Sequence, residues 1–137
     1  MEQIKHSIVV IGGGPAGMAA AVAAFDAGVQ DVVILDREER PGGILKQCIH
    51  NGFGLHKLGR ELTGPEYAAV YEQQVLSRGI KIYRETTAIS LSKERVVLAQ
   101  SKQSILKIKA GAVVLAMGCR ERSRGALNIP GTRPAGV

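Results

Sequence analysis

Residues 8–17 read Ile-Val-Val-Ile-Gly-Gly-Gly-Pro-Ala-Gly, and this stretch decides the fold. The β-branched residues 8–11 are typical of a buried parallel strand, and they end directly in a glycine loop. After the loop, the small side chains of residues 18–27 predict a helix, and residues 32–35 predict a second buried strand. Strand, loop, helix and strand together make one βαβ unit of ordinary length.

The loop has the glycine spacing Gly12-x-Gly14-x-x-Gly17, which binds a dinucleotide pyrophosphate when a strand precedes it and a helix follows. Gly12 permits a tight turn, Gly14 lets the backbone approach the anion, and Gly17 lets helix and strand pack closely. Asp36 ends the next strand, where its carboxylate would accept hydrogen bonds from ribose hydroxyls and repel a 2′-phosphate. The alternative is a structural glycine turn beside a surface aspartate.

The segment that follows, residues 37–62, predicts a long loop because it contains two glycine turns, at residues 41–43 and 51–54. Loops of this length are usually functional or partly helical. Thr63 and Glu66 have the spacing of a capping box and predict the start of a second helix.

Short β-prone runs fill the second half of the chain. Residues 80–83 predict one more strand, and three further runs separated by polar turns predict a three-stranded antiparallel meander. The three runs are residues 86–91, 95–98 and 104–108. A last buried strand is expected at residues 112–116. The predicted fold class is therefore α/β, with a parallel sheet and a β-meander.

The composition is that of a soluble domain, with 45% hydrophobic and 22% charged residues. No uncharged apolar run approaches the ~20 residues that a membrane span needs. The two cysteines, Cys48 and Cys119, are far apart in the sequence and predict no disulfide framework, so we expect a reducing, cytoplasmic location. No cluster of side chains predicts a metal site.

The net charge of +6 arises in the second part of the chain. Residues 61–137 carry twelve Lys or Arg and six acidic side chains, whereas residues 1–60 carry six of each. Nucleic-acid binding is one interpretation, but the sequence has no nucleic-acid motif and only 4% aromatic residues. We favour a solvated or partner-facing surface.

Residues 9–43 resemble the FAD-binding start of the two-dinucleotide-domain flavoprotein oxidoreductases, the superfamily that includes thioredoxin reductase. The turn at residues 41–43 resembles the family's Gly-Gly turn toward the flavin ring, and Ala88 resembles the residue whose backbone reads the adenine edge. Residues 116–118, Ala-Met-Gly, resemble the second FAD motif, which usually reads Ala-Thr-Gly. Arg122 and residues 129–131 continue that motif.

The resemblance implies FAD as the cofactor, with NAD(P) bound only in the complete enzyme. The expected cofactor-binding residues are Gly12, Gly14, Pro15, Ala16, Gly17, Asp36, Arg37, Gly42, Gly43, Ala88, Ala116 and Gly118. It also implies a Rossmann-like FAD-binding domain at residues 1–118, with the meander at about residues 86–109. Because the family inserts an NAD(P) domain and then returns with a late strand, the sheet would be incomplete at the C-terminus. Residues 119–137 would be a tail leading toward that inserted domain.

A closer resemblance is to oxidoreductases similar to the sarcosine oxidase alpha subunit, and it rests on residues 47–54, 61–68 and 118–122. It implies partner subunits but no particular substrate. Two interpretations remain for Cys48: a redox thiol at the flavin, although no second cysteine has the usual spacing, or a small packing residue. His50 is either a proton donor near the flavin or a hydrogen-bonding loop residue. Arginines 120, 122 and 124 face a phosphate or a partner, or are simply solvated.

We therefore expect the FAD-binding part of a flavin-dependent oxidoreductase that passes electrons between NAD(P)H, or a small organic substrate, and FAD. The 137-residue chain alone would be inactive. The alternative is a non-catalytic nucleotide-binding fragment or subunit that needs a partner chain. A simple NAD dehydrogenase would explain the first βαβ unit, but not the turn at residues 41–43 or the meander.

Overall fold

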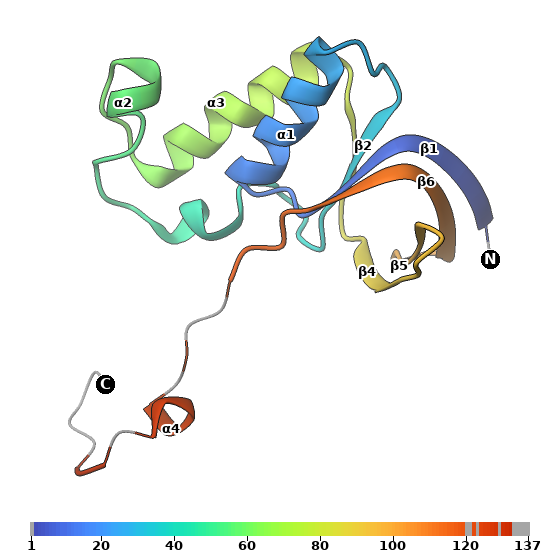
Figure 1. Ribbon diagram of the computed structural model, residues 1–137. Coiled ribbons are helices and arrows are strands. Elements are labelled where there is room, and N and C mark those ends of the chain that lie inside the picture. Colours follow the sequence, from blue (N-terminus) through green and yellow to red (C-terminus); the bar gives the residue numbers. More distant parts are fainter. Residues whose placement is uncertain (1, 120–121, 123, 129, 133–137) are drawn as a thin grey trace.

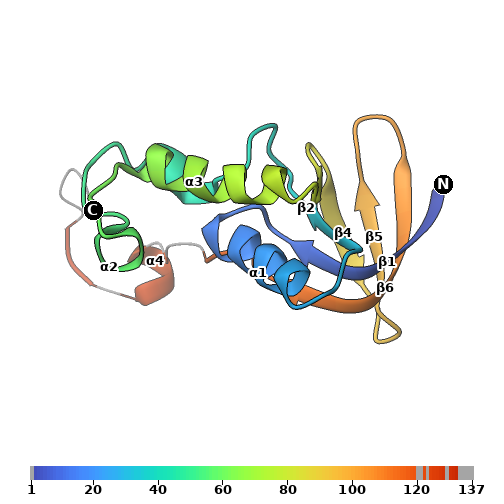
Figure 2. The same cartoon turned by 90° about the horizontal axis from the view of Figure 1, so that it is seen from above.

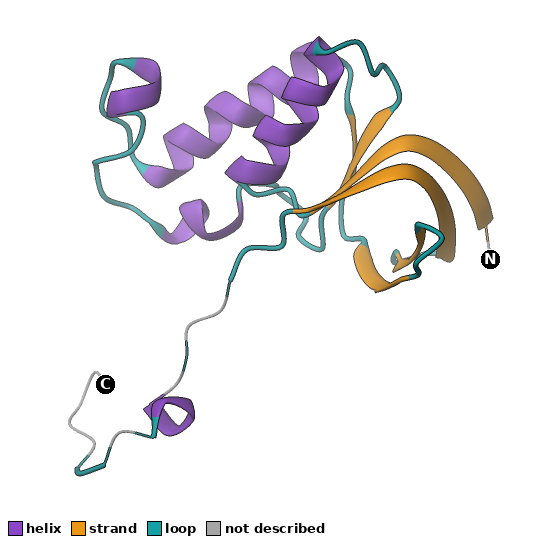
Figure 3. Ribbon diagram, viewed as in Figure 1, coloured by secondary structure: helices purple, strands orange, loops and turns teal. Residues whose placement is uncertain are grey.

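The computed structural model describes residues 2–119, 122, 124–128 and 130–132. In this part of the chain, six strands form one sheet in the order β3-β2-β1-β6-β5-β4 (Figures 1 and 3). The strands are β1 (Glu2–Ile11), β2 (Val32–Leu35), β3 (Lys81–Tyr83), β4 (Thr87–Leu91), β5 (Val96–Gln100) and β6 (Ile105–Leu115). The helices are α1 (Pro15–Asp26), the short 3-10 helix η1 (Gly43–Gln47), α2 (Leu55–Leu58), α3 (Gly64–Ser77) and α4 (Arg124–Leu127). No helix of these described residues is long and apolar enough to cross a membrane.

The sheet has a parallel part and an antiparallel part. Strands β3, β2, β1 and β6 are parallel, whereas β5 and β4 continue from β6 as antiparallel neighbours. Figure 2 shows α1 and α3 side by side along the parallel strands, with β4 and β5 beyond them. The predicted α/β class with a parallel sheet and a meander is confirmed.

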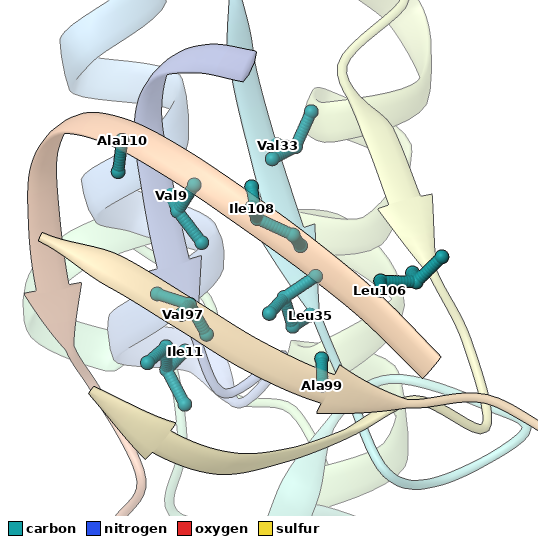
Figure 4. Packing of buried hydrophobic residues seen from close by; sticks show 9 residues of the cluster. All are labelled: Val9, Ile11, Val33, Leu35, Val97, Ala99, Leu106, Ile108 and Ala110. Atoms are coloured by element: carbon teal, nitrogen blue, oxygen red, sulfur yellow. The ribbon is translucent and has the colours of Figure 1, made fainter. Parts of the chain in front are cut away.

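Each face of the parallel strands has its own apolar core. The helix-side core contains Val10, Met18, Ala21, Val22, Val32, Ile34, Tyr71, Val75 and Ile80. The meander-side core, shown in Figure 4, contains Val9, Ile11, Val33, Leu35, Val97, Ala99, Leu106, Ile108 and Ala110. Because β1 and β2 send alternate side chains to the two cores, they are buried on both faces, which explains their continuous β-branched sequence.

One sequence prediction is wrong: the third meander run and the last buried strand are a single strand, β6. Its first half, residues 105–109, pairs with β5, and residues 106–115 pair with β1. Gly111, which interrupts the apolar pattern, does not end the strand. A Cβ at this position would lie 2.6 Å from the Ser7 carbonyl oxygen, so the glycine permits close contact with β1. The same pairing extends β1 back to Glu2, six residues before its predicted start.

The helix start predicted from Thr63 and Glu66 is confirmed. The Glu66 N–H donates to Thr63 Oγ1 at 3.4 Å, and the Thr63 N–H donates to Glu66 Oε2 at 2.8 Å. The long segment at residues 37–62 is partly helical, since it contains η1 and α2. It is fastened by a backbone bridge between Phe53 and Leu62.

Thr63→Ala is expected to lower the free energy of unfolding by about 1 kcal/mol, because it removes the acceptor that caps α3. Hydrogen bonds from the backbone and side chain of Thr63 hold the pKa of Glu66 below its ordinary value. The Glu66 carboxylate therefore contributes fully to the free energy of unfolding above its unfolded-state pKa. This contribution is lost as the pH falls through the lowered pKa of the folded state. Urea unfolding at several pH values measures both effects. The exposed Thr87 provides a control, since Thr87→Ala leaves the cap intact; an equal loss in both variants would contradict the capping role.

Candidate dinucleotide-binding site

The glycine loop lies where three parallel strands end. The Gly12 N–H donates to the Leu35 carbonyl at the end of β2, at 2.9 Å. The Ala116 N–H, just after β6, donates to the Ile11 carbonyl at 2.9 Å. In open α/β sheets, ligands bind outside the carboxyl ends of the strands, and this loop occupies that place.

Gly12 and Gly17 are required by the fold. A Cβ on Gly17 would collide with the Gly12 carbonyl oxygen, which is part of the backbone and cannot move aside. Gly12 has a φ of +112°, and a Cβ there would collide with the carbonyl oxygen of Ala116. The two glycines therefore shape the loop and seat it against Ala116, the first residue of the predicted second motif.

Gly14 is different, because nothing in the folded chain needs a glycine there. Its φ of −72° and ψ of 177° are open to any residue, and no atom lies within 4 Å of a Cβ built on it. Gly14 caps the N-terminus of α1, and Pro15 has no N–H to donate. The first bond across the cap runs from the Met18 N–H to the Gly14 carbonyl, at 2.9 Å. The N–H groups of Ala16 and Gly17 belong to the first turn of α1 and so have no acceptor within the helix, an arrangement suited to an anion.

Asp36 is buried beside this loop, with 7% of its surface exposed. Its Oδ1 accepts a hydrogen bond from the Glu38 N–H at 3.0 Å, and a Cβ on Gly13 would collide with Oδ2. Gly13 therefore leaves room for the carboxylate, a role that sequence reasoning missed although three consecutive glycines were its signal. The neighbouring Arg37 is exposed and forms an ion pair with Glu38, with 3.4 Å between Nε and Oε1.

The glycine turn at residues 41–43 packs against the glycine loop, although 28 positions separate Gly14 from Gly42 in the sequence. The Gly42 N–H donates to the Gly13 carbonyl at 2.8 Å. A Cβ on Gly43 would lie 3.4 Å from the Gly14 Cα, and Gly42 has a φ of +128°. The structure thus brings together the two loops that the sequence predicted to serve one ligand.

The start of the meander reaches Asp36 through Thr86, a second residue that sequence reasoning missed. The Thr86 N–H donates to the Asp36 carbonyl at 2.8 Å, and its hydroxyl donates to the Arg84 carbonyl at 2.8 Å. Only 2% of Thr86 is exposed. Ala88 lies two positions further on, in β4, half-buried and paired with Ala99.

The segment after β6 passes the loop on its other side. Ala116 is half-buried against the helix-side core, Met117 is 68% exposed, and Gly118 has a φ of +73° with no atom within 4 Å of a Cβ. Arg122 is exposed, whereas Arg120 and Ile129 lie outside the described residues.

Cys48 and His50 lie on the segment after η1. The Cys48 thiol donates to the Ile44 carbonyl at 3.5 Å, and the Cys48 carbonyl accepts from the Gly64 N–H at 2.9 Å. A Cβ on Gly64 would lie 2.8 Å from the Cys48 Cβ, so the cysteine packs tightly against the start of α3. His50 is exposed, with Nδ1 2.9 Å from the Asn51 carbonyl oxygen and its ring centroid 5.3 Å from that of Phe53.

The described part of the chain contains both cysteines but no grouping of possible metal ligands. Cys48 and Cys119 are both free thiols there. No three His, Cys, Asp or Glu side chains of those residues are grouped so that they could hold a metal ion.

The fold and the loop geometry define a Rossmann-type dinucleotide-binding domain. The chain belongs to the pyridine nucleotide-disulphide oxidoreductase family, whose sequence profile matches residues 6–136. The superfamily predicted from the motifs is therefore confirmed, while the finer resemblance to the sarcosine oxidase alpha subunit stays a prediction.

Individual relatives support the same family. Thioredoxin reductase of Ureaplasma parvum serovar 3 is 33% identical over 134 residues, which are 96% of this chain and 40% of that protein. An opine oxidase subunit of Agrobacterium tumefaciens (strain Ach5) is 33% identical over 144 residues, covering 96% of this chain and 27% of the relative. The crystal structure of L-proline dehydrogenase from P. horikoshii superposes with a TM-score of 0.71 at 26% identity, over 85% of this chain and 23% of that one. The chain thus spans less than half the length of these relatives.

Proposed function

We propose that this chain is the FAD-binding part of a flavin-dependent oxidoreductase that passes electrons between NAD(P)H, or a small organic substrate, and FAD. The observation that carries the proposal is the open space at Gly14, in a loop whose other glycines are required by the fold. Bound FAD would supply the electron and hydride chemistry, and the residues of this chain would bind and orient it.

Each part of the site has a proposed role toward FAD. The free first-turn N–H groups of α1 would bind the pyrophosphate, as helix N-termini do. The buried carboxylate of Asp36 would accept hydrogen bonds from ribose hydroxyls, and this acid disfavours a 2′-phosphate at that position. Gly42 and Gly43 would let the backbone pass close to the cofactor on its way to the flavin. The remaining expected contacts are Pro15, Ala16, Arg37, Ala88, Ala116 and Gly118.

The finer assignment is to the group of oxidoreductases similar to the sarcosine oxidase alpha subunit. The 33% identity to the opine oxidase subunit supports it, since that relative is by name one component of a multi-subunit oxidase. The proposal includes partner subunits for this chain and an electron donor that is a small organic compound or NAD(P)H.

One observation favours the alternative of a nucleotide-binding subunit or fragment that needs further polypeptide. Beyond Lys109, β6 pairs with β1 on one side, and among the described residues no strand pairs with its other edge. Leu115, at the end of this stretch, is 57% exposed. An open strand edge with exposed apolar side chains is ordinarily covered by another segment.

The reading frame beyond Val137 and one kinetic experiment distinguish the two functions. A continuation with a second GxGxxG and a late Gly-Asp supports the oxidoreductase, while a stop codon supports the subunit. The complete protein is then purified, its flavin spectrum is recorded, and reduction by NADH, NADPH and small amines is followed anaerobically at 450 nm. Stoichiometric flavin that one of these donors reduces supports the proposal. A complete protein that carries no flavin, or only adenine nucleotide, contradicts it.

Cys48→Ser in the complete protein is expected to leave the rate of flavin reduction within about threefold of the wild type. The thiol of Cys48 donates to the Ile44 carbonyl and packs against α3, and a serine hydroxyl makes the same bond. Rapid-mixing absorbance measures the rate, and Cys119→Ser is the matched control. A fall of several orders of magnitude for Cys48→Ser alone would establish a single-cysteine mechanism instead.

A further inference from the structure

A second polar region lies away from the glycine loop, at the start of the β1–β6 pair. Figure 1 shows β1 and β6 bending together beyond the helices toward the N-terminus. An open hollow of about 390 Å³ lies here, and Lys5, Ser7, Asp31, Arg95, Lys109 and Gly111 are among its lining residues. Its volume lies within the range of small-molecule sites.

Beside the hollow, β1 and β6 both change the side that their alternate residues face. Before the change, even-numbered residues such as Ile4 and Ile108 face the meander-side core; after it, odd-numbered residues such as Val9 and Val113 do. The change falls at Ser7 and Gly111, the two residues that the register between β1 and β6 skips. The odd-numbered residues before it therefore face away from that core.

Two of these outward residues are lysines in directly opposite positions. Lys5 pairs in register with Lys109, and like charges so placed on neighbouring strands repel one another. Arg95 adds a third positive charge from the turn between β4 and β5, where its φ of 60° is unfavourable for a residue with a Cβ. Its carbonyl accepts from the Ala110 N–H at 2.9 Å, which holds the turn against β6.

The residues that line the hollow include three positive side chains and one acid, Asp31, which is already hydrogen-bonded. Within the described residues, the side chains of Lys5 and Arg95 have no hydrogen-bond or ion-pair partner, and Lys109 donates to the Glu94 carbonyl. The pKa of Glu94 is lowered by hydrogen bonds from Ser92 and its own backbone, and also by the charge of Lys109. Asp31 accepts from the Ser7 N–H at 2.7 Å through Oδ2, and its Oδ1 lies 2.6 Å from His6 Nδ1. The His6 contact is also the main reason that the pKa of Asp31 is lowered.

We propose that this hollow binds a small, multiply charged anion of the phosphate class, held by Lys5, Lys109 and Arg95 with the Ser7 hydroxyl as a further donor. A bound dianion offsets the repulsion between Lys5 and Lys109. The open shape and flexible lysine stems suit a compact phosphate rather than a large apolar ligand. The site is independent of the FAD loop, so the two proposals can fail separately.

Titration of the ¹⁵N-labelled protein with inorganic phosphate, at an ionic strength held constant with chloride, tests the site. Saturable shifts are expected for the amides of His6, Ser7 and Ala110. Shifts at Gly13 and Gly14 report phosphate at the glycine loop in the same experiment, so the two sites are separated by residue. Lys5→Gln and Lys109→Gln are each expected to weaken binding at the hollow by about threefold to fivefold.

Lys57→Gln, which removes the same charge from the exposed helix α2, is the matched control and leaves the affinity unchanged. Two outcomes overturn the proposal: shifts confined to Gly13 and Gly14, or linear, non-saturating shifts around Ser7. Equal weakening by Lys57→Gln would also overturn it, because the effect would then reflect net charge alone.

Discussion

Gly14→Val is expected to abolish flavin binding by the complete protein without unfolding it. The valine side chain enters space that the folded chain leaves empty, and the backbone angles of Gly14 are ordinary for any residue. Its cost to the helix N-terminus is at most about 1 kcal/mol. The same side chain occupies the approach to the first-turn N–H groups of α1. Hydrogen bonds to a charged group contribute about 1.5–3 kcal/mol each, so losing two of them weakens FAD by about a hundredfold or more.

Gly17→Ala is the matched control, because it adds a side chain to the same loop at a position where the folded chain has no room for one. Its Cβ collides with the Gly12 carbonyl oxygen, so we expect destabilisation of about 1–3 kcal/mol. Thermal unfolding measures stability, and absorbance at 450 nm after desalting measures retained flavin. The FAD assignment would be refuted by Gly14→Val protein that keeps one flavin per chain. Wild-type stability in Gly17→Ala would show that the loop geometry is wrong.

The sequence predicted those parts of the structure in which local pattern and tertiary packing agree. Residues 8–11 and 32–35 are apolar on both faces, and both are buried strands of the parallel sheet. The Thr63–Glu66 spacing is a purely local signal, and the hydrogen bonds that it predicts are present. The motif spacing of Gly12, Gly14 and Gly17 likewise indicated the turn between strand and helix.

Other features depend on contacts between distant segments, which no local pattern contains. In the sequence, Gly111 looks like a residue that ends a strand. In the structure it permits close contact with Ser7 of β1, which lies more than a hundred positions earlier. Gly13 is explained only by the carboxylate of Asp36, and Thr86 only by its backbone bond to the same residue. The turn at residues 41–43 was assigned to the cofactor site from family resemblance alone, and its contact with Gly13 was not predicted.

The distribution of charge over the surface also depends on contacts between distant segments. The excess of positive charge in residues 61–137 was evident from the sequence, but not its distribution over the surface. Lys5, from the balanced first part of the chain, faces Lys109 only because β1 and β6 are parallel neighbours. A count of charges along the chain therefore could not identify the hollow that these two residues share.

The isolated 137-residue chain is expected to bind FAD weakly, to self-associate and to oxidise no NADH. The outer edge of β6 beyond Lys109 lacks a strand partner among the described residues, and Leu115 and Met117 are exposed beside the glycine loop. Open edges and apolar patches of this kind promote association. In the proposed site, the glycine loop and Asp36 would hold the adenosine and pyrophosphate half of FAD. A nicotinamide would need a site that the glycine loop, already proposed for FAD, does not provide.

The flavin half of the cofactor would then have few protein contacts, and a loss of about 3 kcal/mol weakens affinity by roughly two orders of magnitude. Quenching of FAD fluorescence measures binding to the isolated chain, light scattering measures its mass, and absorbance at 340 nm follows NADH. ADP is the informative control, because a chain that holds only the adenine and pyrophosphate half binds ADP about as tightly as FAD. Tight, stoichiometric FAD on a monomer that turns over NADH would contradict this expectation. It would mean that these 137 residues suffice as a minimal flavoprotein, and that the open edge of β6 needs no covering segment.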